Sequence, residues 1–302
     1  YSNPVYGGTD HFIKHVLTKF GVEIVGFTPA DTREDIEALI ENHPAKDRLA
    51  MIYVETPANP TLDLFDIKEC AEMAKKYSRN DEDRVYLTVD NTYMGPLWQH
   101  PLKHGADFVV YSATKYIGGH SDVIAGAVLG NASVMKRVKT LRSFLGNMAG
   151  PHTGWLLLRS LETLKIRMEK QAQSAAKIAG FLKGHPKVEK LYYLGNLEGT
   201  GSSDERIFKQ QMECAGAMLS FDVKGGEKEA FVCLNALKLI KLAVSLGGTE
   251  SLAEHPATMT HVGVDADLRD QLHITGKMVR LSVGVEDADD LIWDLEQALE
   301  KV

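Results

Sequence analysis

The chain has 302 residues and a formal net charge of −7, a length sufficient for one large domain or two ordinary ones. The mildly acidic balance and the lack of a Lys/Arg run argue against nucleic acid or an anionic membrane as a partner. No apolar run approaches the roughly 20 residues of a membrane helix. The 3 scattered cysteines lack a CxxC pair, which indicates a reducing cytoplasm rather than disulfides or a metal knuckle.

Hydrophobic periodicity predicts alternating strands and helices along the chain. Strands are expected at residues 22–27, 49–55, 85–89, 108–112, 125–129, 188–193, 217–223, 242–245 and 279–283. Helices are expected at residues 12–20, 33–42, 66–77, 132–141, 154–182, 227–237 and 288–299. The alternation in the first half favours a parallel sheet flanked by helices. We expect a large domain at 1–165 and a small one at 166–302, with the boundary inside the helix at 154–182.

The stretch from Val109 to His120 begins as a β-branched apolar run, typical of a buried strand, and ends in a glycine pair. Lys115 stands where this strand breaks. A lysine leaving a core strand is costly unless its amine is used, and a desolvated amine can form an imine with an aldehyde cofactor. Ser112 and Thr114 would point the same way along an extended chain, so both could donate to a phosphate. The lysine, the two hydroxyl residues and the nearby glycines together suggest a pyridoxal 5'-phosphate site. An ordinary surface loop with a solvated lysine explains the same residues equally well.

The strand expected at 85–89 is followed by Asp90. Pyridoxal chemistry needs a carboxylate against the pyridine nitrogen, which keeps the ring protonated. Such groups lie at the carboxyl ends of strands in parallel α/β sheets, and a crossover would bring Asp90 and Lys115 to the same edge. A strand-end aspartate alone is more often a turn former or helix cap. Its pairing with Lys115 favours the cofactor interpretation.

A set of motifs then identifies a family. In chain order they are Glu-Thr-Pro-Ala-Asn-Pro-Thr at 55–61, Val-Asp-Asn-Thr at 89–92, Tyr-Ser-Ala-Thr-Lys at 111–115, Ser-Leu-Gly-Gly-Thr-Glu-Ser-Leu at 245–252 and Arg-Leu-Ser-Val-Gly at 280–284. The set resembles the cysteine/methionine-metabolism family of pyridoxal-phosphate enzymes, which includes methionine γ-lyase, cystathionine γ-lyase and cystathionine γ-synthase. The resemblance implies an α/β, aspartate-aminotransferase-like architecture (fold type I), with a large, mostly parallel sheet domain and a smaller α+β C-terminal domain.

The resemblance also implies roles for the residues at the motif positions. Lys115 would bind the cofactor and later move protons, Asp90 would partner the pyridinium, and Ser112 and Thr114 would bind the phosphate. Tyr6 would stack on the ring and act as an acid on the leaving group. Outside this family, Tyr6 would be interpreted as a packing residue.

Three further positions concern the substrate. Arg280, on an alternating strand, suits a bidentate clamp on the α-carboxylate, with a structural ion pair as the alternative. By resemblance, the backbone of Ser245 helps hold that carboxylate. Asn59 matches the asparagine that hydrogen-bonds the cofactor's phenolic oxygen beside the substrate; without the family it would be a turn residue.

The resemblance implies γ-elimination of a sulfur amino acid to α-ketobutyrate, ammonia and a thiol. Val244 precedes Ser245, as in methionine γ-lyases, whereas the cystathionine enzymes tend to carry glutamate there. Two positions depart from the methionine γ-lyases, which usually have cysteine where Gly8 stands and a Lys-Asp pair where Arg142 and Ser143 align. Because the apolar Val244 suits a methyl thioether, we still expect an L-methionine-like substrate. The alternatives are a cystathionine γ-lyase and a γ-replacement synthase acting on an activated homoserine.

The family places a long segment before the motif that begins at Tyr6, so an N-terminal part is expected to be missing, with residues 1–4 as a remnant. That segment lends phosphate ligands to a neighbouring subunit, which keeps a non-catalytic binding protein as an alternative. The resemblance implies a homotetramer built from active-site dimers. His100 and His104 are spaced like metal ligands, but Pro101 lies between them and no acidic pattern accompanies them, so we expect no metal.

Overall fold

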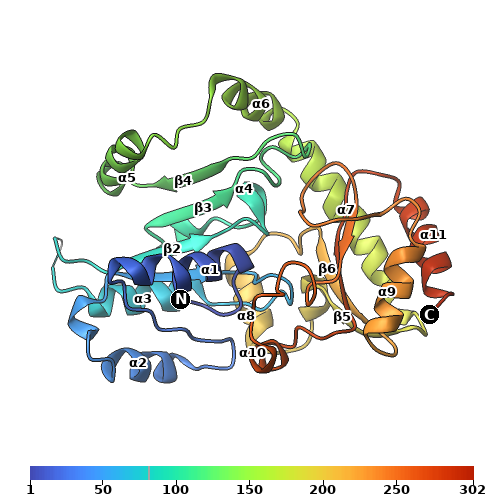
Figure 1. The fold of residues 1–302 in the computed structure, drawn as a ribbon, viewed down its shortest axis with the longest axis horizontal. Helices are drawn as coiled ribbons and strands as arrows, with labels where there is room; N and C mark the ends of the chain where they lie inside the picture. Colours follow the sequence, from blue (N-terminus) through green and yellow to red (C-terminus); the bar gives the residue numbers. More distant parts are fainter. Residues whose placement is uncertain (81) are drawn as a thin grey trace.

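The structure is a computed structural model that describes residues 1–80 and 82–302. Its strands form two sheets, which lie side by side in Figure 1. The first sheet has the order β1 (Met51–Glu55), β2 (Tyr86–Asp90), β3 (Phe108–Ser112) and β4 (Gly126–Gly130). The second has the order β5 (Val188–Tyr192), β6 (Met218–Val223), β9 (Met278–Ser282), β8 (Leu252–Glu254) and β7 (Lys241–Leu242).

Helices surround both sheets. The α-helices are α1 (Gly7–His15), α2 (Arg33–Glu41), α3 (Ile67–Tyr77), α4 (Gly95–Trp98), α5 (Ala132–Leu145), α6 (Pro151–Leu161), α7 (Leu164–Gly184), α8 (Ser203–Gln211), α9 (Glu227–Ala236), α10 (Ala266–Gln271) and α11 (Ala288–Leu299). Short 3-10 helices lie at Leu17–Phe20, Lys46–Arg48, Pro101–His104 and Leu194–Leu197. Among the described residues, no helix has both the length and the apolar character needed to cross a membrane.

Strand direction in the first sheet sets the position of the candidate site. β1, β2 and β3 are parallel, and β4 pairs antiparallel with β3. The register places Glu55 opposite Asp90, and Asp90 opposite Val110. Since parallel strands end at one edge of a sheet, Glu55, Asp90 and Ser112 are brought to the same edge. The predicted parallel sheet is confirmed, with one antiparallel edge strand added.

The core of the first sheet forms where α3 packs on it. Asp66 caps α3 by accepting hydrogen bonds from the backbone N–H groups of Lys68 and Glu69. The buried face of α3 comprises Ile67, Cys70, Met73 and Ala74, at the three- and four-residue spacing of a helix. These side chains share a core with Val54 and Leu87. Each fully buried aliphatic side chain stabilises the fold by about 1.5–3 kcal/mol.

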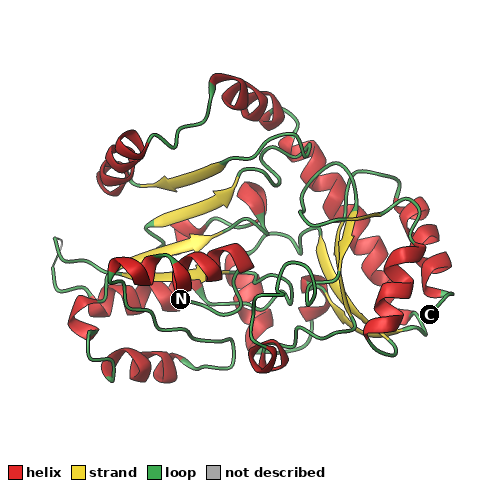
Figure 2. Ribbon diagram, viewed as in Figure 1, coloured by secondary structure: helices red, strands yellow, loops and turns green. Residues whose placement is uncertain are grey.

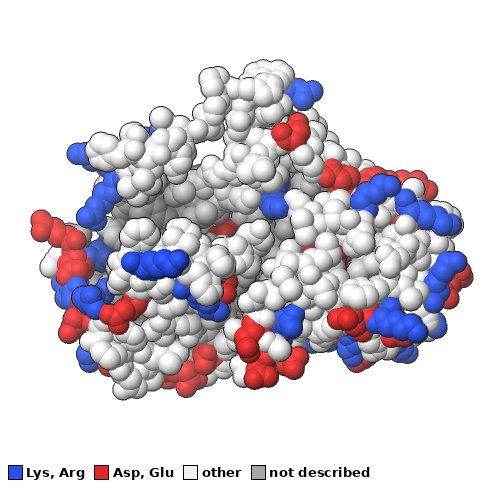
Figure 3. Space-filling model, viewed as in Figure 1, with Lys and Arg blue, Asp and Glu red and all other residues white. Residues whose placement is uncertain are grey.

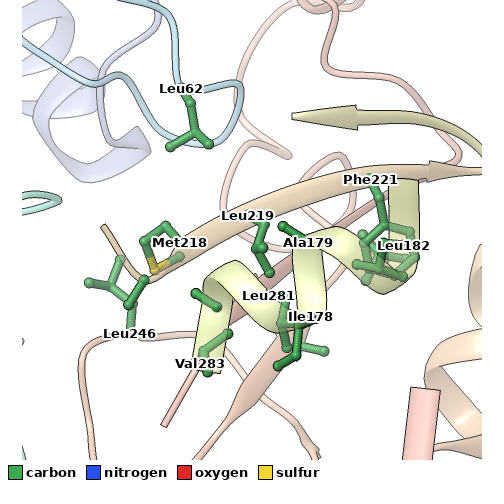
Figure 4. Packing of buried hydrophobic residues seen from close by; sticks show 14 of the residues in the cluster. Leu62, Ile178, Ala179, Leu182, Met218, Leu219, Phe221, Leu246, Leu281 and Val283 are labelled. Atoms are coloured by element: carbon green, nitrogen blue, oxygen red, sulfur yellow. The ribbon is translucent and has the colours of Figure 1, made fainter. Parts of the chain in front are cut away.

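A second core lies between the second sheet and its helices. Every residue of β6 is buried, and α7, α9 and α11 pack together against this sheet (Figure 2). Figure 4 shows Ile178, Ala179 and Leu182 of α7 facing the strand residues Leu219 and Phe221. The same core includes Leu62, Tyr93, Trp98 and Tyr116. Side chains from the first half of the chain thus bind the two sheets into one packed unit.

The helix expected at 154–182 is in fact two helices, α6 and α7, interrupted at Glu162 and Thr163. Periodicity does not reveal the break because no glycine or proline marks it. The structure stabilises it with Arg167, whose guanidinium donates to the carbonyl of Ser160 and whose Nε donates to Thr163 Oγ1. We propose that the domain boundary, predicted near residue 165, coincides with this break.

Several predicted helices and strands differ from those in the structure. Residues 22–27 make only an isolated parallel bridge, between Ser2 and Phe27, supported by backbone hydrogen bonds from Asn3 N to Phe27 O and from Phe27 N to Tyr1 O. The helix expected at 12–20 starts earlier, as α1, and finishes as a 3-10 turn closed by Gly21. The strand expected at 242–245 is the two-residue β7. Helices α4, α8 and α10 and strand β8 were not predicted from the sequence.

Candidate active site

Lys115 lies in a tight turn directly after β3. The turn is closed by a hydrogen bond of 3.0 Å from Lys115 N to Ser112 O, and residues 113–118 form consecutive turns. The Lys115 ammonium donates to Ser245 Oγ at 2.8 Å. Burial, followed by the positive charge of Arg280, lowers the pKa of Lys115, and the nearby Glu254 opposes this shift. A larger fraction of the amine is therefore uncharged and nucleophilic than for a lysine in water.

The loop that carries Ser245 is held tightly against the Lys115 turn. Ser245 has a φ of 94°, unusual for a residue with a side chain and a mark of functional sites. Two residues later, Gly247 has a φ of 72°, and a Cβ there would lie 2.8 Å from Tyr116 N. Only glycine permits this approach. The loop therefore presents Ser245 to Lys115 because Gly247 lets the two backbones meet.

Asp90 ends β2, is partly buried, and accepts a network of hydrogen bonds. Its Oδ1 accepts from Thr92 N at 3.0 Å and Thr92 Oγ1 at 2.6 Å, and its Oδ2 accepts from Tyr53 OH at 3.2 Å. Burial raises the pKa of Asp90, and the bonds from Thr92 and Tyr53 act in the opposite direction. No Lys, Arg or His of the described chain forms an ion pair with it. A protonated pyridine nitrogen is the kind of cation that this carboxylate lacks.

The structure corrects the geometry expected for the two hydroxyl residues. The extended chain ends at Ser112, so Thr114 lies in the turn and not two residues farther along a strand. Thr114 Oγ1 accepts from Ala125 N at 3.0 Å and lies 3.3 Å from Ala125 O. Ser112 is joined to the end of β2 because its N–H donates to Thr92 Oγ1 at 2.9 Å. Both residues stay predicted phosphate ligands, on either side of Ala113.

Arg280 is 3% exposed and connects several parts of the site. Its Nη1 lies 2.7 Å from Glu254 Oε1 and donates to Asn59 Oδ1 at 3.1 Å, and its Nη2 donates to the carbonyl of Ser245 at 2.8 Å. The ion pair considered as an alternative is therefore present, and the backbone of Ser245, expected to help hold the same carboxylate, lies in contact with Arg280. In the described chain, Arg280 Nε and Glu254 Oε2 are buried without hydrogen-bond partners, so the guanidinium retains capacity for a further acceptor.

Asn59 is oriented by its neighbours. Its Oδ1 accepts from Tyr93 OH at 2.5 Å and from Arg280. Because the carbonyl oxygen is occupied, the amide Nδ2 is left to donate, as a residue binding a phenolic oxygen must. Sequence reasoning missed both Tyr93 and Glu254. Both stand next to quoted motifs, Tyr93 after 89–92 and Glu254 after 245–252. Their partners in the site belong to other segments of the chain, so the motifs alone do not reveal these contacts.

Tyr6 precedes α1 and is 51% exposed. Its ring lies over the first turn of α1, where a Cβ on Gly8 would come within 2.6 Å of Tyr6 Cε1. The absence of a side chain at Gly8 therefore permits this position of the ring. An exposed phenol at this edge of the sheet can meet both a planar ring and a leaving group.

Two other features do not belong to the constellation around Lys115. An apolar cavity of about 940 Å³ lies between α1, α2 and β1; it reaches Tyr6 and Tyr53 but not Lys115. His100 lies 3.3 Å from Glu213. Over residues 1–80 and 82–302, no group of three or more His, Cys, Asp or Glu side chains could hold a metal ion.

Comparison with known proteins identifies the family. The sequence model of the family described as "Cys/Met metabolism PLP-dependent enzyme" matches residues 1–300. The L-methionine gamma-lyase of Fusobacterium nucleatum subsp. polymorphum is 41% identical over 300 residues, which cover 99% of this chain and 72% of that protein. The cystathionine gamma-lyase of Bacillus subtilis (strain 168) is 41% identical over 302 residues, covering 100% of this chain and 76% of that protein.

A solved structure extends the agreement to the fold. The cystathionine gamma-lyase from Lactobacillus plantarum, complexed with L-serine, has a TM-score of 0.87 and 39% identity, covering 100% of this chain and 75% of that one. The expected family, fold type I and the pyridoxal phosphate cofactor are thereby confirmed. The chain belongs to the Cys/Met metabolism PLP-dependent enzymes and is a carbon–sulfur lyase that depends on pyridoxal phosphate.

Proposed function

We propose that the protein catalyses γ-elimination of an L-methionine-like amino acid, giving α-ketobutyrate, ammonia and a thiol. The observation that carries this proposal is the contact chain through Ser245, whose hydroxyl meets the Lys115 amine and whose carbonyl meets the Arg280 guanidinium. A substrate whose carboxylate binds Arg280 would have its Cα within the reach of Lys115. Val244, adjacent in sequence and 50% exposed, offers an apolar contact suited to a methyl thioether.

Each residue of the site has a definite task in this reaction. Bound pyridoxal phosphate supplies the electron sink for the negative charge that develops on the substrate. Lys115, whose lowered pKa favours the uncharged amine, takes the proton from Cα and handles the proton at Cβ. Asp90 would hold the ring nitrogen, and Asn59 would donate its amide to the phenolic oxygen. Tyr6 donates its phenolic proton to the departing sulfur.

Arg280 would bind the substrate carboxylate with donors that its protein partners leave unused. A guanidinium has five N–H donors, and the hydrogen bonds to Asn59, Glu254 and Ser245 do not use all of them. These fixed partners hold the planar group in one orientation before the substrate arrives. Preorganised charge of this kind favours a bidentate carboxylate over a neutral group.

We further propose a homotetramer of active-site dimers located in the cytoplasm. The segment containing α5 and α6 exposes Phe144, Leu145, Trp155 and Leu158, and Figure 3 shows that its visible surface carries few charges and borders a hollow above α1. An apolar surface of this kind is typical of subunit interfaces. The cysteines Cys70, Cys214 and Cys233 are free, which suits a reducing compartment.

The test is product analysis on the protein with added pyridoxal phosphate. L-Methionine and L-cystathionine are offered separately, and α-ketobutyrate, pyruvate and released thiols are measured. Lys115→Ala is expected to abolish product formation, whereas the exposed control Lys103→Ala retains it. Methanethiol and α-ketobutyrate from methionine are the expected products.

The other outcomes contradict specific parts of the proposal. Turnover of cystathionine alone would show that Val244 does not select a methyl thioether, and pyruvate would indicate β-elimination. Bound cofactor without any keto acid would favour γ-replacement on an activated homoserine. A failure to bind the cofactor at all would contradict the roles given to Lys115 and Asp90.

A further inference from the structure

Glu55, the last residue of β1, is a buried carboxylate to which the mechanism above gives no task. Its side chain is 4% exposed. Its Oε2 accepts a hydrogen bond of 2.8 Å from the backbone N–H of Tyr6, and its Oε1 accepts one of 3.0 Å from the backbone N–H of Asn59. Within the described chain, no Lys, Arg or His forms an ion pair with it. Both oxygens are thus used to bind main chain, and not to balance a charge.

The two segments that Glu55 joins are remote from each other in sequence. Tyr6 immediately precedes α1, and Asn59 lies in the turn that follows β1. Glu55 also faces Asp90 in the register of β1 and β2, and its own N–H donates to Ser2 Oγ at 3.0 Å. A single carboxylate therefore fixes the ring-stacking residue and the phenolic-oxygen donor relative to the strand that carries the pyridinium partner.

The location of Glu55 is costly, which points to a purpose other than stability. Burial, followed by the charge of Asp90, raises the pKa of Glu55 to about 8, and the bonds from Tyr6 and Asn59 oppose this shift. Placing a second carboxylate beside Asp90 in a desolvated position disfavours its charged form. Buried polar groups that cost stability concentrate at functional sites.

We propose that Glu55 is a positioning residue that holds Tyr6 and Asn59 in the arrangement needed to bind pyridoxal phosphate. The proposal rests on the roles proposed above for those two residues. This positioning requires a side chain at residue 55 with two acceptor oxygens, one for each backbone N–H. A glutamine has one carbonyl oxygen, and its NH₂ group would face a backbone N–H, so one of the two segments would lose its acceptor and move.

The experiment measures the dissociation constant of pyridoxal phosphate after removal of the cofactor, by the absorbance of the bound form. Glu55→Gln is compared with Glu205→Gln. Glu205 is a matched control because its Oε1 and Oε2 accept from the backbone N–H groups of Gly199 and Gly201 at 2.7 and 2.6 Å, at the start of α8 and away from Lys115. Glu55→Gln is expected to raise the dissociation constant about tenfold or more, the effect of one lost buried acceptor. Glu205→Gln is expected to change it less than about twofold.

A double mutant tests whether Glu55 acts through its partners. In an Asn59→Ala background, the change caused by Glu55→Gln is expected to be clearly smaller than in the wild type, because one of the positioned groups is already gone. A purely structural role predicts the same factor in both backgrounds. Because binding is measured without a substrate, failure to turn over methionine would contradict the proposed reaction and leave this result unaffected.

The proposal is overturned if Glu55→Gln binds the cofactor as the wild type does, or if it weakens binding no more than Glu205→Gln. If circular dichroism shows that Glu55→Gln is unfolded, the dissociation constant of pyridoxal phosphate is measured for Glu55→Asp instead. Aspartate keeps the carboxyl group and both oxygens but is one methylene shorter, so it cannot reach both N–H groups. A folded Glu55→Asp with weakened binding supports the proposal, and one with wild-type binding refutes it.

Discussion

Gly247→Ala is expected to disable the site through the backbone alone. Gly247 has a φ of 72°, and a Cβ would lie 2.8 Å from Tyr116 N and 3.0 Å from Tyr116 Cγ. The left-handed conformation costs an alanine about 1 kcal/mol, and overpacking adds about 1–3 kcal/mol. We expect a loss of about 2–4 kcal/mol in the free energy of unfolding, lessened if the loop moves away.

Movement of the loop that carries Ser245 and Gly247 is expected to lower the catalytic rate. Ser245, two residues earlier, would lose its 2.8 Å contacts to Lys115 and Arg280. A displacement of about 1 Å in positioning groups lowers rates about 100-fold, so kcat/KM should fall by that order. The assays are denaturant unfolding and steady-state kinetics on the substrate that the product analysis identifies.

Gly21→Ala is the matched control for this prediction. Gly21 has a φ of 77°, and a Cβ would meet nothing within 4 Å. This variant should therefore lose only the conformational cost of about 1 kcal/mol and retain its kcat/KM. If Gly247→Ala and Gly21→Ala behave alike in both stability and kinetics, the close approach at Tyr116 does not position Ser245 and the reasoning is refuted.

Three further predictions concern charge, specificity and the stacking residue. Because its pKa is raised to about 8 from 4.5, folded Glu55 retains a proton between these pH values that the unfolded chain releases. The free energy of unfolding of the cofactor-free protein should therefore fall as pH rises from about 4.5 to about 8. Denaturant titrations measure this fall, and an equal fall in Glu55→Gln would contradict the prediction. Val244→Glu should shift kcat/KM from methionine towards cystathionine, because a carboxylate can pair with the distal amine; an unchanged ratio would remove Val244 from the specificity argument. Gly8→Ala should displace the Tyr6 ring, since its Cβ would lie 2.6 Å from Tyr6 Cε1, and lower kcat by about tenfold or more as proton donation weakens; kinetics equal to the wild type would show that the ring position does not matter.

Much of the site could be predicted from sequence because its residues lie at the ends of regular strands. The β-branched runs before Asp90 and Ser112 define β2 and β3, and parallel pairing then brings their ends to one edge. The ordered motifs identified the family and its cofactor, which the match over residues 1–300 confirms. The roles of the individual residues stay predictions, and the structure shows only that they lie together.

Local pattern failed where long-range contacts decide the conformation. The break between α6 and α7 carries no glycine or proline, and Arg167 stabilises it from the following helix. Thr114 was expected on an extended chain, but it lies in a turn held by the backbone of Ala125. In both cases the deciding partner is a residue that neither periodicity nor turn composition identifies.

The sequence by itself therefore determined the chemistry available to this protein: a lysine, an aspartate, hydroxyls and an arginine at motif positions of a pyridoxal-phosphate family. Only the tertiary structure decided how these groups are oriented. The bonds from Lys115 to Ser245 and from Arg280 to Asn59 join residues separated by 130 and 221 positions, and the bond from Tyr6 to Glu55 joins residues separated by 49 positions. Such contacts depend on how whole elements pack, because side chains from separate elements become neighbours only after the two sheets share a core.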